Sequence, residues 1–118
     1  METRAFAPLY TTATPANTGS FLPSTTIAAS TSAATNATQF AGAAGSGFYQ
    51  LQIANTTSGW AYVNVGQVGA VTAATVATGY PVAPGGVVVI SVQPEVNAAS
   101  VILGTGSGSV IFSRGEGL

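Results

Sequence analysis

The sequence predicts an all-β protein: an antiparallel β-sandwich or jelly roll of about six to eight short strands, with an extended N-terminal arm. Short β-prone runs recur roughly every 8–12 residues between glycine, proline and asparagine turn signals. All thirteen valines lie between Val63 and Val110, and no alternating strand–helix units are present. A chain of 118 residues is long enough for one core. We therefore expect an arm over residues 1–20 and one sandwich domain over residues 21–118.

The first part of the chain is polar and small. Thr, Ser and Ala fill 27 of its first 47 positions, and Val is absent there. Such a terminus is commonly disordered. However, Phe6, Leu9 and Tyr10 are large apolar residues that would suit docking on a neighbouring molecule. Both a disordered terminus and a docked arm are compatible with this composition.

Residues 21–28 and 33–40 are expected to form two modest strands joined at residues 30–32. Residues 33–44 are alternatively a short helix, because alanine is the best helix former. Threonine and asparagine residues and the lack of an apolar stripe favour the strands over the helix.

Residues 48–54 (FYQLQIA) alternate between apolar and polar side chains. Tyr49, Leu51 and Ile53 are expected to point into the core, and the two glutamines between them to point outward. This alternation is typical of a half-buried strand.

After a turn cluster at residues 55–59, residues 60–65 (WAYVNV) are expected to return as the hairpin partner of that strand. Residues 70–77 predict a weaker strand. Residues 98–103 and 109–113 predict two more strands, joined by a glycine-rich hairpin turn.

Residues 80–86 (YPVAPGG) predict a rigid turn that leads into residues 87–92 (VVVISV). Pro84 fixes φ at the second turn position, and Gly85 can adopt the positive φ that a type II turn needs next. An unbroken apolar run indicates a strand covered on both faces. We therefore expect residues 87–92 to be a central strand with a scaffold role.

Charge is the most unusual feature of the composition. The charged residues are Glu2, Glu95, Glu116, Arg4 and Arg114, which is 4% of the chain. A monomer of this mass exposes roughly 5,800 Å² of surface, and soluble domains cover it with about 25–35% charged residues. Either polar uncharged side chains cover the surface, or much of it is buried against other chains. We expect both.

This composition excludes several classes of function. Two arginines do not supply the positive charge that nucleic-acid binding needs. The N-terminal residues lack the basic and apolar regions of a secretory signal, and no apolar run approaches the ~20 residues of a membrane helix. We therefore expect no nucleic-acid or membrane partner, and synthesis in a cytoplasm without export by a signal peptide.

Catalytic chemistry is also disfavoured. General acid–base catalysis needs titratable groups within reach of one substrate, but the three acids are far apart in sequence and the chain has no His, Lys or Cys. No base is available to activate a serine or threonine. The glycines of residues 104–108 lie between two strands, whereas a phosphate-binding loop precedes a helix. We expect no enzyme activity, cofactor or metal.

The remaining candidates are partner contacts. Trp60 and Tyr62 share one strand face, where they form either a sugar-stacking platform or part of the core, and the core is favoured. Residues 114–118 (RGEGL) are expected to form a C-terminal tail that contains two glycines. In this tail, Arg114 can pair with a carboxylate of its own or a neighbouring chain. The predicted contact residues are Phe6, Leu9, Tyr10, Arg114, Glu116 and Leu118.

The chain resembles small structural proteins of tailed bacteriophages. The similarity lies in four segments: residues 51–55 (LQIAN), 60–66 (WAYVNVG), 81–85 (PVAPG) and 110–118 (VIFSRGEGL). The resemblance implies a sandwich or jelly-roll module on the outer capsid surface, often a decoration (cement) protein, with no catalytic residues.

On this resemblance we expect a virion protein that binds the major capsid protein and copies of itself and stabilises the particle. Two alternatives remain: a receptor- or glycan-binding module of a head or tail fibre, and a neck or tail-completion component.

Overall fold

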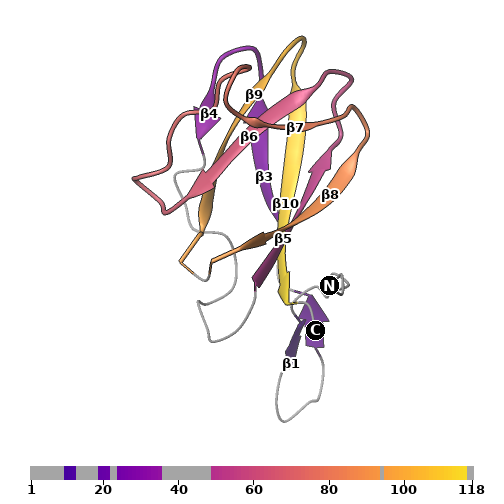
Figure 1. Ribbon diagram of the computed structural model, residues 1–118. Helices are drawn as coiled ribbons and strands as arrows, with labels where there is room; N and C mark the ends of the chain where they lie inside the picture. Colours follow the sequence, from indigo (N-terminus) through magenta and orange to yellow (C-terminus); the bar gives the residue numbers. More distant parts are fainter. Residues whose placement is uncertain (1–9, 13–18, 22–23, 36–48, 94, 117–118) are drawn as a thin grey trace, which may run out of the picture.

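The computed structural model describes residues 10–12, 19–21, 24–35, 49–93 and 95–116. These residues form a β-sandwich of two four-stranded antiparallel sheets and contain no helix (Figure 1). Sheet I has the order β3 (Thr25–Ala29), β10 (Gly108–Glu116), β5 (Tyr49–Asn55) and β8 (Val87–Val92). Sheet II has the order β4 (Ala34–Thr35), β9 (Ala98–Leu103), β6 (Ala61–Gly66) and β7 (Tyr80–Val82). The all-β sandwich prediction is confirmed.

The core lies between the facing sides of the two sheets. Alternate residues of each strand supply it, as the two-residue period of a strand requires. Its buried members are Ile27, Ala29, Leu51, Ile53, Ala61, Val63, Val82, Ala99, Val101, Leu103, Val110 and Phe112. The predicted alternation of β5 is confirmed for Leu51 and Ile53, although Gln50 on the opposite side of the strand is also buried.

Most connections in the described part cross from one sheet to the other. β5 lies in sheet I between β10 and β8, whereas β6 lies in sheet II between β9 and β7. The predicted β5–β6 hairpin is therefore wrong, and so is the hairpin of β9 with β10, which also belong to different sheets. Neither loop contains the two-residue Asn-Gly or Asp-Gly signal that closes a tight hairpin.

A buried asparagine holds the crossing from β5 to β6. Asn55 is 1% exposed. Its amide Nδ2 donates to the carbonyl oxygens of Gly59 at 2.9 Å, Val82 at 3.0 Å and Ala83 at 3.2 Å. Its Oδ1 accepts from the backbone N–H of Thr57 at 3.0 Å and from the Thr57 hydroxyl at 2.7 Å. One side chain thus joins the end of β5, the start of β6 and the end of β7.

The turn between β7 and β8 is confirmed. The Gly86 N–H donates to the Ala83 carbonyl at 2.8 Å, and Gly85 has a φ of 69°. Pro84 and Gly85 therefore occupy the two central positions of a turn with positive φ at the second, as type II requires. Because Asn55 binds the Ala83 carbonyl, the start of β8 is fixed relative to β5.

The segment 67–79 covers the outer face of sheet II. The Ala74 N–H donates to Ser100 Oγ at 2.9 Å, and Asn64 Nδ2 donates to the Thr72 carbonyl at 3.2 Å. The predicted strand over residues 70–77 is wrong, because this segment consists of turns and irregular backbone that bonds to side chains of the sheet. The strand covered on both faces is β9, which is buried along almost its whole length.

The N-terminal predictions are resolved only in part. Of the two strands expected over residues 21–28 and 33–40, β3 and the two-residue β4 are present, and the rest of 33–44 beyond residue 35 lies outside the described residues. β1 (Tyr10–Thr12) and β2 (Gly19–Phe21) pair in a separate two-stranded antiparallel sheet. The arm over residues 1–20 and the jelly-roll topology remain predictions.

The asparagine network predicts a large stability effect at one position. In the Asn55→Ala variant, the Nδ2 donor is lost from two buried bonds, to the Gly59 and Val82 carbonyls, and from one partly buried bond, to the Ala83 carbonyl. We expect the free energy of unfolding to fall by about 3 kcal/mol. Asn64→Ala, which removes the same type of side chain from exposed bonds, should lower it by less than about 1 kcal/mol. Chemical denaturation of both variants measures the difference, and equal losses would contradict the role of Asn55.

Candidate functional site

Strand β8 is one of the two edge strands of sheet I among the described residues. Val87 is 57% exposed and Val89 is 41% exposed, and the strand alternates between exposed and half-buried residues. The prediction of a covered central strand is therefore wrong. β8 pairs with β5 on one side only, and the described segment that covers an outer face, residues 67–79, lies over sheet II instead.

The free side of β8 presents backbone groups of alternate residues. The Asn55 N–H donates to the Gly86 carbonyl at 2.9 Å, so Gly86 faces β5. Because hydrogen bonding alternates along an antiparallel pair, the even-numbered residues from 88 to 92 also face β5. The N–H and C=O groups of Val87, Val89 and Ser91 then point away from it. In the described part of the chain, no strand pairs with that side.

The other sheet edges are less suited to strand pairing. β7 has three residues, and its central Pro81 has no N–H to donate. β4 has only two residues. β3 has five, but its exposed side chains are Thr26 and Ala28. β8 is thus the longest and most apolar edge among the described strands.

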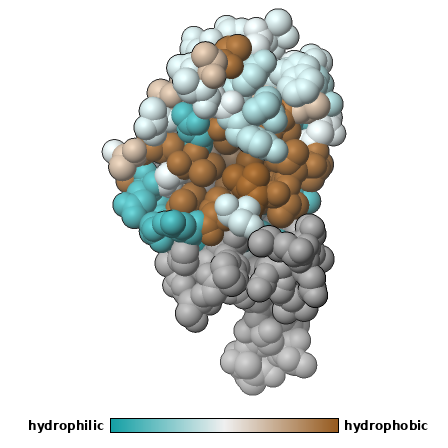
Figure 2. All heavy atoms as spheres, viewed as in Figure 1, coloured by the Kyte–Doolittle hydropathy of each residue, from teal (hydrophilic) through white to brown (hydrophobic). Residues whose placement is uncertain are grey.

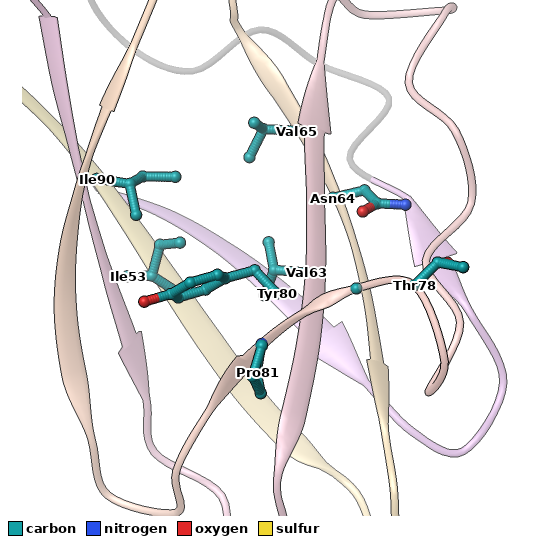
Figure 3. Close-up of a pocket in the computed structure, with 9 residues that line it drawn as sticks. Ile53, Val63, Asn64, Val65, Thr78, Tyr80, Pro81 and Ile90 are labelled. Atoms are coloured by element: carbon teal, nitrogen blue, oxygen red, sulfur yellow. The ribbon is translucent and has the colours of Figure 1, made fainter.

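An apolar cleft of about 540 Å³ opens beside β8, between the two sheets. Its lining residues are Ile53, Val63, Asn64, Val65, Thr78, Gly79, Tyr80, Pro81 and Ile90. Figure 3 shows the ring of Tyr80 extending from β7 across this opening, while the side chain of Asn64 turns away from it. Hydrophobic residues form one patch where Figure 1 draws β8 (Figure 2). The edge strand and the cleft are therefore adjacent, because Ile90 of β8 lines the cleft.

A second exposed apolar group lies at the start of β6. Trp60 is 50% exposed, so its predicted place in the core is wrong. Tyr62 is half-buried, because the backbone at Gly79 packs closely against it: a Cβ atom at Gly79 would lie 2.7 Å from the Tyr62 Cβ. The segment 67–79 thus covers Tyr62 and leaves the indole of Trp60 accessible.

The structure describes only some of the residues predicted as partner contacts. Phe6, Leu9 and Leu118 lie outside the described residues, so their roles remain predictions. Tyr10 begins β1 and Glu116 ends β10. β10 continues three residues beyond the predicted end at residue 113, and Arg114 is only 6% exposed within it. Sequence reasoning missed β8, whose valines indicated a buried strand.

The described residues include no cluster of three or more His, Cys, Asp or Glu side chains that could hold a metal ion. Residues 104–107 join β9 to β10, so the glycines there precede a strand and not a helix. Nor do the described ranges contain a helix long and apolar enough to span a membrane.

Comparisons with known proteins give no assignment. No family model, no curated protein and no solved structure matches the chain. A functional proposal therefore depends on the geometry and chemistry of the chain itself.

Proposed function

We propose that this chain is a non-enzymatic virion structural protein: a capsid decoration (cement) protein that binds the outer capsid surface of a tailed bacteriophage and copies of itself. The observation that carries the proposal is the uncharged, exposed edge strand β8, with Val87 and Val89 facing solvent. Monomeric proteins usually protect such an edge with lysine, proline or a bulge. An edge that lacks such protection suits a protein that functions as part of an assembly.

The charge-poor composition supports the same proposal. A chain with 4% charged residues makes contacts that depend on apolar area and backbone hydrogen bonds, which salt screens little. Each copy needs only a modest interface, because many copies on one capsid bind by avidity. The phage-like segments described above agree with this role.

Trp60 supports a second candidate function. Its half-exposed indole provides an aromatic surface on which a sugar ring can stack. This arrangement suits a glycan-binding module of a head or tail fibre. The edge strand β8 has no part in that alternative.

The decoration proposal predicts where the protein lies on a particle. In a cryo-electron microscopy map of the phage that encodes it, the protein should occupy repeated lattice positions on the outer capsid. Its copy number should scale with that of the major capsid protein. Particles lacking it should release DNA at a lower temperature and recover when purified protein is added. A single ring of copies at the neck, or no copies in the particle, would overturn the proposal.

The glycan alternative predicts a single decisive variant. Trp60→Ala should abolish binding on a glycan array if the indole stacks on a sugar. Tyr80→Ala, which removes an equally exposed aromatic ring from the cleft, should leave binding unchanged. No binding by the unmodified protein would exclude this function on the glycans tested.

A further inference from the structure

We propose that β8 pairs antiparallel with β8 of a second copy, about a two-fold axis centred on Val89. Two copies of sheet I would then form one continuous sheet. The inference deepens the self-association included in the proposed function and rests on it, although the pairing itself needs no capsid.

The backbone determines the register of this pairing. The outward N–H and C=O groups belong to Val87, Val89 and Ser91, as the alternation along β5 and β8 requires. An axis at Val89 places Val89 opposite Val89 of the second copy, and Val87 opposite Ser91 of the second copy. All three outward residues of each strand then exchange hydrogen bonds, which is the mode of recognition by strand addition.

The side chains are compatible with this register. On the outer face of the sheet, the exposed Val89 residues of the two copies would meet and exclude water from each other. On the core face, Val88 would lie opposite Ile90 of the second copy. Because Ile90 also lines the cleft, the second copy would extend the sheet I wall of the cleft beyond β8. The pairing therefore buries the exposed Val89 side chains against each other and lengthens one wall of the cleft.

Charge identifies a second copy as a suitable occupant. β5 and β8 contain no charged residue, so two identical edges approach without repulsion. Glu95 follows β8 in the chain, and an antiparallel two-fold places the two Glu95 residues at opposite ends of the contact. Contact between β8 and the far edge β3 of another copy would instead be head-to-tail and would not close into a dimer.

A single introduced cysteine tests the register, because the chain has no cysteine of its own. Directly opposite residues in a hydrogen-bonded pair have Cα atoms about 5.5 Å apart, within the range of about 4.4–6.8 Å that a disulfide spans. Val89→Cys should therefore give a covalent dimer under mild oxidation. Val87→Cys should not, since the two copies of residue 87 would lie about 13 Å apart along the strands.

Val76→Cys is the matched control for this cross-linking, because Val76 is 52% exposed in the segment over sheet II.

Light scattering of the unmodified protein should show a concentration-dependent species of twice the 11.6 kDa chain mass. Val89→Lys should shift it to the monomer by placing two ammonium groups opposite each other, whereas Val76→Lys should not. An equimolar mixture of Val89→Lys and Val89→Glu should restore the dimer.

Three outcomes would overturn the pairing: a monomer at every concentration, equal cross-linking through positions 76 and 89, or a ladder of larger species indicating head-to-tail contact. A monomer that still decorates particles would overturn the pairing alone. A dimer that is absent from particles would support the pairing and overturn the decoration function.

Discussion

The buried amide of Asn55 is the interaction on which the arrangement of this sandwich most depends. The chain crosses between sheets at nearly every described connection, so local turn geometry does little to align one sheet with the other. The carboxamide of Asn55 binds backbone groups that follow β5, precede β6 and end β7. A buried polar group with all its bonds satisfied specifies one arrangement, because any other leaves it unpaired. The position of β8 follows, since the turn that begins it includes the Ala83 carbonyl bound by Asn55.

The strands themselves could be predicted from sequence, because their signals are local. The bounds of β8 and β9 match the predicted segments 87–92 and 98–103, and the turn at Gly85 has the expected positive φ. The pairing of strands could not be predicted, since it depends on residues far apart in the chain. β8 and β9 are similarly apolar, and β9 became the covered one because the segment 67–79 folds over sheet II.

The candidate site was missed for the same reason. The sequence predicts partner contacts at the two ends of the chain and only a scaffold role for residues 87–92. An apolar run carries the same sequence signal whether its second face meets the core, a loop or another molecule. Trp60 illustrates the opposite error: an aromatic residue beside a strand suggested the core, yet half of its surface is exposed.

The edge of β8 that no other described strand covers is the proposed self-association surface, and amide hydrogen exchange measured at several protein concentrations tests this proposal. The N–H groups of Val87, Val89 and Ser91 should exchange quickly in dilute protein and more slowly as the concentration rises. Those of Val88 and Ile90, which face β5, should remain protected throughout. Fast exchange at Val89 at every concentration, or equal protection of both sets in dilute protein, would contradict self-association through β8.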